Sequence, residues 1–331
     1  MTQVLTQYVP CDLCGASDHE ILFSKIDPVT GMEFHLVQCP CGMAFVNPMP
    51  AAESIPLLYP KDYLAGKEHR VSKYLEMIRL LPELSYGKLL DVGCGRGDFI
   101  YHASRVGWDV EGVDLMDWDS PYNLPIKVGD FLAMDLPERA YNVVTAWALL
   151  EHVREPSKFF GKISGLLKAD GKFIFVVPNV QAPGMRHACS EDIPRHLWLF
   201  TPAAVRRYLD RFGMDAALIL HNGRIYQAHP FGLLRYWLRG LRKKETRCAL
   251  YENKAVALLR NRQIKGNLRP WIADTMESVG PVDLFLDAVD LGIGVALAFV
   301  SSMMGNYGVM TVIACKRPAT SPVVDETGTK G

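Results

Sequence analysis

The sequence lacks a net charge. Lysine and arginine together number 36, as do aspartate and glutamate, so the formal charge of the 331-residue chain is zero. A chain without excess positive charge has no overall electrostatic attraction to nucleic acid, which argues against a DNA partner and disfavours an RNA partner. The first residues, MTQVLTQYVPCDLC, also lack a charged segment followed by an apolar one. We therefore expect a cytoplasmic protein whose eight cysteines are reduced.

Charge is also missing from one long stretch near the C-terminus. The 25 residues between Asp290 and Lys316, LGIGVALAFVSSMMGNYGVMTVIAC, carry no acidic or basic side chain. A stretch of this length is long enough to span a membrane. The turn residues 305–308 divide it, so we expect a buried apolar helix followed by a β-branched strand, VMTVIAC, with a membrane span as the alternative.

Strand and helix patterns alternate through the middle of the chain. The strand-like runs are KLLDVG, DVEGVDL, IKVG, NVVTAWALL and KFIFVVPN, and helical or loop segments separate them. This alternation predicts an α/β fold with a parallel, doubly wound sheet. Two crossover helices are expected: FFGKISGLLKADG, ended by Gly171, and TPAAVRRYLDRFG, which begins with Thr201 as its cap and Pro202 in its first turn.

Three glycines follow the first of these strands, in LLDVGCGRGDF. Gly93, Gly95 and Gly97 allow the backbone N–H groups at the start of a helix to approach a ligand closely. Their spacing is GxGxG, whereas the dinucleotide fingerprint is GxGxxG, so NAD is disfavoured. The carboxylate of Asp91, just before the loop, disfavours a pyrophosphate and favours a ligand with cationic groups.

The stretch LLDVGCGRG resembles the first motif of class I S-adenosylmethionine (SAM)-dependent methyltransferases. GVDL, VGDF, AWALLEHVREP and LLKADGKFIFVVPN extend the resemblance, over roughly residues 70–221, to the small-molecule branch that includes ubiquinone-type O-methyltransferases. It implies a Rossmann-like seven-stranded sheet with an antiparallel last strand, and SAM as the cofactor. By this resemblance Asp114 accepts both ribose hydroxyls, while Asp130 and Phe131 hold the adenine. The predicted SAM-binding residues are Asp91, Gly93, Gly95, Gly97, Asp114, Asp130, Phe131 and Trp147.

Two histidines are the candidate catalytic bases. His152 follows the fourth strand, at the carboxyl edge where ligands of open α/β sheets bind, and an imidazole is suited to deprotonating a hydroxyl or an activated carbon. His196 lies in IPRHLWLFTP, a segment that similar enzymes fold over the acceptor. The alternative for His152 is a histidine that only anchors the following helix. Some ubiquinone-type relatives hold a divalent metal with a second acid at the position of Ala148, so metal-assisted transfer is in doubt here.

Paired cysteines mark the N-terminal region. Cys11 and Cys14 form CxxC, and Cys39 and Cys41 form a CxC pair that is one residue shorter than usual. Four thiolates from two closely spaced cysteine pairs are typical of a tetrahedral structural zinc site. The alternative is four reduced thiols without a metal. This module resembles those of bacterial methyltransferases that act on sugars or envelope precursors, and those of an rRNA methyltransferase family.

A basic and apolar segment, PFGLLRYWLRGLRKK, follows the predicted core. As a helix it places Phe231 and Trp237 on one side and Arg235 and Arg239 largely on the other. Such a helix can lie on an anionic membrane surface, cover the active site or form a homodimer interface. These alternatives stay open, and the first would suit peripheral membrane association or a lipid-linked substrate.

Together these patterns predict a methyltransferase with two additions to its core. The predicted segments are a zinc-ribbon-like module (1–50), a helical linker (51–87), the SAM-binding core (88–221), a helical acceptor-side insertion (222–305), the last core strand (306–317) and a flexible tail (318–331). The predicted function is transfer of a methyl group from SAM to an oxygen or carbon of a small molecule, either a sugar, a quinone-like compound or a lipid-linked precursor. The alternatives are a zinc-containing RNA methyltransferase and a SAM-binding protein without catalysis.

Overall fold

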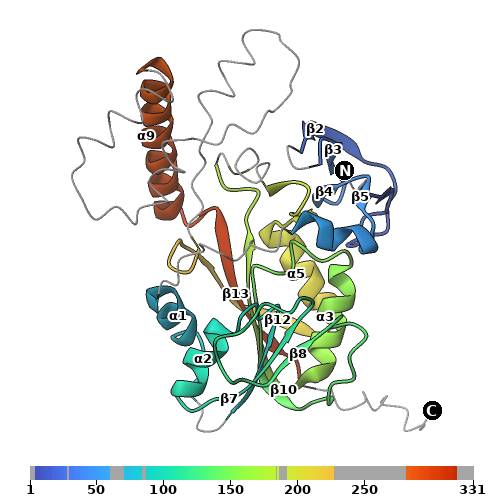
Figure 1. The fold of residues 1–331 in the computed structure, drawn as a ribbon, viewed down its shortest axis with the longest axis vertical. Helices are drawn as coiled ribbons and strands as arrows, with labels where there is room; N and C mark the ends of the chain where they lie inside the picture. The colour runs from blue at the N-terminus through green and yellow to red at the C-terminus, as the bar shows by residue number, and fades with distance from the viewer. Residues whose placement is uncertain are drawn as a thin grey trace, which may run out of the picture.

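A seven-stranded sheet forms the centre of the protein. The computed structural model describes residues 4–27, 30–59, 71–83, 87–183, 185, 192–226 and 281–318. The strand order is β12-β13-β10-β9-β6-β7-β8 (Figure 1). The strands are β6 (Lys88–Val92), β7 (Asp109–Asp114), β8 (Ile126–Val128), β9 (Tyr141–Trp147), β10 (Leu167–Pro178), β12 (Met214–His221) and β13 (Val309–Lys316). Within this sheet β13 runs antiparallel to both of its neighbours, which confirms the predicted fold class.

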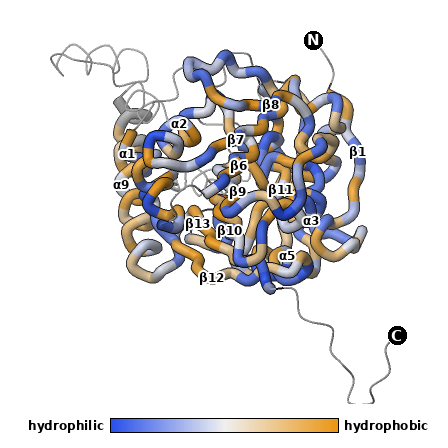
Figure 2. The backbone as a smooth tube through the Cα atoms, turned by 90° about the horizontal axis from the view of Figure 1, so that it is seen from below, coloured by the Kyte–Doolittle hydropathy of each residue, from blue (hydrophilic) through white to orange (hydrophobic). Residues whose placement is uncertain are grey.

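Helices cover both faces of the sheet. On one face lie α1 (Val71–Ile78) and α2 (Asp98–Arg105), whose apolar side chains share a buried cluster with Leu89 of β6. On the other face lie α3 (Pro156–Leu166) and α5 (Pro202–Arg211), which share a second cluster with Leu90. Successive strand residues thus enter opposite layers, as expected for a sheet buried on both sides. The tube in Figure 2 is accordingly largely orange, that is hydrophobic, along β12 and β13.

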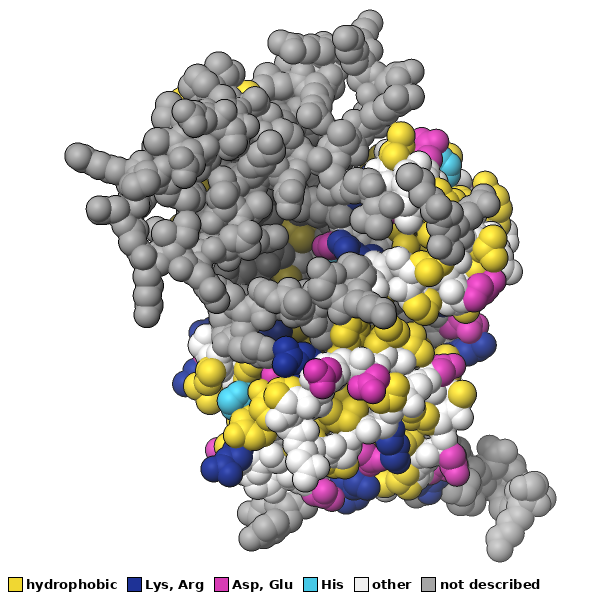
Figure 3. All heavy atoms as spheres, viewed as in Figure 1, with side chains coloured by type: hydrophobic (Ala, Val, Ile, Leu, Met, Phe, Trp, Pro, Cys, Tyr) yellow, Lys and Arg dark blue, Asp and Glu magenta, His cyan; other side chains and the backbone are white. Residues whose placement is uncertain are grey.

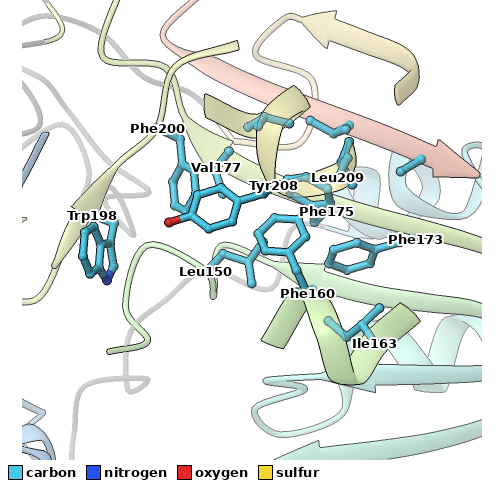
Figure 4. Packing of buried hydrophobic residues seen from close by; sticks show 14 of the residues in the cluster. Leu150, Phe160, Ile163, Phe173, Phe175, Val177, Trp198, Phe200, Tyr208 and Leu209 are labelled. Atoms are coloured by element: carbon cyan, nitrogen blue, oxygen red, sulfur yellow. The ribbon is translucent and has the colours of Figure 1, made fainter. Parts of the chain in front are cut away.

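Aromatic rings hold α3, α5 and β10 together. The ring of Tyr208 stacks on that of Phe160 with centroids 4.9 Å apart. The ring centroid of Phe200 lies 6.0 Å from that of Tyr208. Figure 4 shows these side chains with Phe175 and Leu209 around them. Such pairs add stability beyond their buried area, so this layer fixes how α3 and α5 sit on the sheet.

The N-terminal region forms a smaller sheet that includes a strand from much later in the chain. Its order is β11-β4-β3-β2, and β1 pairs with β5 nearby. The elements are β1 (Thr6–Gln7), β2 (Glu20–Ile26), β3 (Glu33–Gln38), β4 (Ala44–Val46), β5 (Met49–Pro50), the 3₁₀ helix η1 (Ala52–Leu58) and β11 (Trp198–Leu199). Trp198 of β11 stacks on Phe45 of β4 with centroids 4.7 Å apart. The predicted boundary at residue 50 therefore lies within a region that is packed onto the core.

One predicted helix end is correct and another is wrong. Thr201 caps α5, because its Oγ1 accepts a hydrogen bond from the Ala204 N–H at 3.1 Å. The helix expected to run to Gly171 ends at Leu166 instead. Leu167 is fully buried and pairs with Tyr141 of β9, so strand pairing overrides the helical pattern of this stretch.

The uncharged stretch near the C-terminus forms the later part of α9 (Pro281–Met303) and then β13, as the turn residues predict. The helix is less buried than expected: Phe285, Phe299 and Met303 are each about two-thirds exposed or more. No helix in the described ranges has the length and hydropathy of a membrane span. The basic and apolar segment at 230–244 lies outside the described residues. Figure 3 shows described acidic, basic and apolar side chains interspersed on the face in view.

Candidate active site

The glycine-rich loop joins β6 to α2 at the carboxyl edge of the sheet. Gly93, Gly95 and Gly97 have φ angles of +75°, +56° and +86°, in the left-handed region that favours glycine. Gly97 is also the N-cap of α2. A Cβ on Gly93 would lie 2.9 Å from Cδ1 of Leu149, in the turn that follows β9. The backbone conformation thus favours glycine at position 93, and any larger residue there would also force the Leu149 side chain to shift.

Asp114, the last residue of β7, holds the loop in place. Its Oδ2 accepts a hydrogen bond from the Gly95 N–H at 2.8 Å. Its Oδ1 accepts from the Met116 N–H at 3.0 Å and from the indole N–H of Trp118 at 2.8 Å. These donors fix the carboxylate beside the glycines, where the resemblance places the ribose; ribose binding itself stays a prediction.

Asp91 lies in β6 beside Thr145 of β9. The side chain is 2% exposed, and the Thr145 hydroxyl donates to its Oδ1 at 2.6 Å. The pKa of Asp91 is raised to about 8, mainly because the carboxyl is buried. The negative charge of Asp114 raises this pKa further, whereas the hydrogen bond from Thr145 lowers it. A cation that arrives at this carboxyl would favour its charged form.

The other predicted SAM-binding side chains differ in exposure. Trp147 is the last residue of β9, is 7% exposed, and its ring contacts that of Phe99 edge to face. Its buried indole N–H has no hydrogen-bond partner among the described residues. Asp130 is exposed, and its Oδ1 accepts from the Leu132 N–H at 2.9 Å. Phe131 is 4% exposed and packs against other core side chains. Their contacts with adenine stay predictions.

Both predicted bases lie in one cluster with Glu151. Glu151 and His152 follow β9, whereas His196 precedes β11. The rings of His152 and His196 are 4.7 Å apart between centroids. One nitrogen from each ring and one carboxyl oxygen of Glu151 lie within 4.8 Å of one another. Glu151 is 2% exposed, burial raises its pKa to about 8, and its Oε2 has no hydrogen-bond partner within the described part of the chain.

Two oxygen atoms face Nδ1 of His152. The backbone oxygen of Arg195 and the hydroxyl oxygen of Tyr59 each lie 3.0 Å from it. A carbonyl oxygen can only accept a hydrogen bond, so Nδ1 carries the proton. In the neutral ring Nε2 then holds the lone pair, which is the form in which an imidazole can act as a base.

The turn after β9 connects this cluster to the glycine loop. Leu149, whose side chain packs against Gly93, accepts through its backbone oxygen from the His152 N–H at 2.8 Å. No sequence pattern pointed to Tyr59 or Arg195. Tyr59 precedes His152 by 93 residues, and no local pattern connects two residues so far apart.

The four paired cysteines converge at the N-terminal region. The sulfur atoms of Cys11 and Cys41 lie 3.7 Å apart, those of Cys14 and Cys39 lie 3.3 Å apart, and all four lie within 4.8 Å of one another. Each pair forms a tight turn, closed by the N–H of the glycine that follows it. With zinc–sulfur bonds of about 2.3 Å, tetrahedral coordination separates the sulfur atoms by about 3.8 Å, so this set fits a zinc ion.

Comparison with known proteins agrees with the geometry of the core. Residues 67–217 match the model of the methyltransferase domain family. The ubiquinone biosynthesis O-methyltransferase of Proteus mirabilis (strain HI4320) is 32% identical over 104 residues, covering 28% of this chain and 42% of that protein. The enzyme of the same name from Rhodopseudomonas palustris (strain HaA2) is 27% identical over 163 residues, covering 43% and 64%. The chain thus spans less than two thirds of the length of these relatives.

One solved structure with a similar arrangement is geranyl diphosphate C-methyltransferase from Streptomyces coelicolor A3(2). It is 15% identical, the match covers 78% of this chain and 86% of that one, and the TM-score is 0.45. The family match rests on the stretch that carries the glycine loop, Asp114 and the cluster after β9. Residues 67–217 thus match a methyltransferase domain, in agreement with the resemblance that the sequence motifs carry.

Proposed function

We propose that this protein transfers a methyl group from SAM to an oxygen or carbon of a small molecule, of the sugar, quinone-like or lipid-linked class. One observation carries the proposal: Leu149 packs on Gly93 of the glycine-rich loop and accepts from the His152 N–H through its backbone oxygen. This supports a methyl donor and a candidate base at the same edge of the sheet. The ubiquinone biosynthesis O-methyltransferases named above support a small acceptor with a hydroxyl group.

The residues of this chain would align the acceptor with the methyl group of SAM and supply a base. SAM, when bound, supplies a methyl group on a positively charged sulfur, and transfer requires the acceptor atom to lie in line with that bond. Nε2 of His152 would take the proton of the acceptor, while the carbonyl oxygen of Arg195 accepts from Nδ1–H and keeps the ring in place. His196, whose ring lies 4.7 Å from that of His152, would border the acceptor or act as the second base.

The experiment is to offer labelled SAM to the protein with small-molecule and RNA fractions of a lysate of its own host. We expect label in a small molecule, and at least about a hundredfold loss of rate in His152→Ala, because a positioned base contributes that much or more. His102→Ala, in α2, is the control. Label in RNA would favour the RNA methyltransferase, and SAM binding with no turnover in any fraction would favour the non-catalytic alternative. Calorimetry that detects NAD but neither SAM nor S-adenosylhomocysteine would overturn the proposal.

We also propose that Cys11, Cys14, Cys39 and Cys41 hold a structural zinc ion. Four protein ligands complete a tetrahedral shell and leave no position for a substrate. The fit of the four sulfur atoms supports this. We expect about one zinc per chain in elemental analysis and loss of that zinc in Cys14→Ser, with Cys315→Ser as the control. Zinc well below one equivalent in freshly purified protein would contradict the assignment.

A further inference from the structure

Tyr59 approaches the active site from the N-terminal region. It directly follows η1, and its N–H donates to the Pro56 carbonyl at 3.2 Å. The preceding residue, Leu58, is 5% exposed and belongs to a buried cluster with Phe34 and Val46 of the N-terminal sheet. The Tyr59 backbone is therefore positioned by a buried cluster that the N-terminal sheet shares with the segments after β10.

The hydroxyl of Tyr59 reaches across to the candidate base. Its oxygen lies 3.0 Å from Nδ1 of His152, and the two rings meet at 69° with centroids 6.1 Å apart. The carbonyl oxygen of Arg195 lies at the same distance from the same nitrogen. Since Arg195 fixes the proton on Nδ1, Tyr59 acts there as an acceptor, and one N–H is shared between two oxygen atoms that come from distant parts of the chain.

This arrangement has a consequence for proton transfer. When Nε2 takes a proton, positive charge develops on the ring, and both oxygen atoms at Nδ1–H stabilise it. Among the described residues, the titratable or charged groups near the ring include the His196 imidazole, the Glu151 carboxyl and the Asp192 carboxylate. Asp192 itself accepts from the guanidinium of Arg195 at 3.1 Å. Of the two oxygen atoms at Nδ1, that of Tyr59 belongs to a side chain and can be removed by mutation.

We propose that Tyr59 is a positioning residue for methyl transfer: beside the Arg195 carbonyl, which fixes the tautomer, it holds the His152 ring in the orientation that presents Nε2 to the acceptor. The N-terminal region would thereby build part of the acceptor side of the site in addition to its cysteine cluster. The inference rests on the proposed function, because it assumes that His152 is the base.

The test is Tyr59→Phe in the full chain, with Tyr8→Phe as the matched control. Tyr8 lies in the same region, and its side chain is 76% exposed. For Tyr59→Phe we expect kcat to fall about tenfold, the effect of losing one hydrogen bond to a charged group, while the Kd of SAM stays within about twofold. The acidic limb of the pH–rate profile should move to lower pH, because the protonated ring loses an acceptor.

Nitrogen NMR of ¹⁵N-labelled histidine gives a readout that does not need an acceptor substrate. The wild-type protein should show His152 as the Nδ1–H tautomer. Tyr59→Phe should keep this tautomer, which the Arg195 carbonyl fixes, but the Nδ1 resonance should shift because the N–H loses one acceptor. His152→Gln identifies the signal. Wild-type protein with the proton on Nε2, or a Tyr59→Phe variant with unchanged kcat, pH profile and Nδ1 chemical shift, would overturn the inference. An inactive His152→Ala beside a fully active Tyr59→Phe would refute this role alone, whereas a fully active His152→Ala would refute the proposed base.

Discussion

SAM binding should depend on pH through Asp91. The carboxyl is buried beside Thr145, and burial raises its pKa to about 8. Without ligand, it is therefore ionised in about one molecule of eleven at pH 7 and about one of a hundred at pH 6. If the ammonium group of SAM needs the carboxylate, the apparent Kd rises by the inverse of that fraction. SAM should then bind about ninefold more tightly at pH 7 than at pH 6.

Calorimetry at these two pH values checks this expectation. Titrations in buffers of different ionisation enthalpy should show about 0.9 proton released per SAM bound at pH 7, because the ligand displaces the proton held by Asp91. Asp91→Asn should bind weakly, with an affinity that changes less than about twofold between the two pH values. If the affinity of the wild-type protein for SAM changed as little between the two pH values, and no proton were released on binding, the reasoning would be refuted.

Thr145→Val sharpens the test. The Thr145 hydroxyl donates to Asp91 at 2.6 Å and lowers the pKa of that carboxyl, so its removal should raise the pKa further. SAM binding at pH 7 should weaken while the increase in affinity with pH persists. A Thr145→Val protein with wild-type affinity at pH 7 would show that ionisation of Asp91 does not limit binding.

Three further substitutions test the geometry. Gly93→Ala should lower the free energy of unfolding by about 1–2 kcal/mol and weaken SAM binding at least tenfold, because its Cβ would meet Leu149 at a φ of +75°; wild-type affinity in calorimetry would contradict this. Tyr208→Phe removes a buried hydroxyl that donates to Asp12 at 2.8 Å, and urea denaturation should show a loss of about 1–3 kcal/mol. A loss below about 0.5 kcal/mol would mean that this bond contributes little. Thr201→Ala should cost about 1 kcal/mol in the same assay, and Thr201→Ser, which keeps the cap, much less.

Local patterns in the sequence were enough to predict several features. The GxGxG loop, the Thr201 cap and the cysteine pairs depend on residues only a few positions apart, and each pattern allows few backbone conformations. The order of strands followed from the alternating pattern together with the family resemblance. In these cases the chemistry of neighbouring residues favours the same structure as the tertiary packing.

Other features depended on contacts between distant segments. Leu167 belongs to β10 and not to the predicted helix, because pairing with β9 buries its side chain completely. Phe299 is exposed although its segment is apolar. The convergence of Glu151, His152, His196 and Tyr59 brings together three separate stretches of chain. The raised pKa of Asp91 likewise arises from burial. The sequence specifies which groups are available, but only the packed structure sets the distances and the access to water on which hydrogen bonds and ionisation depend.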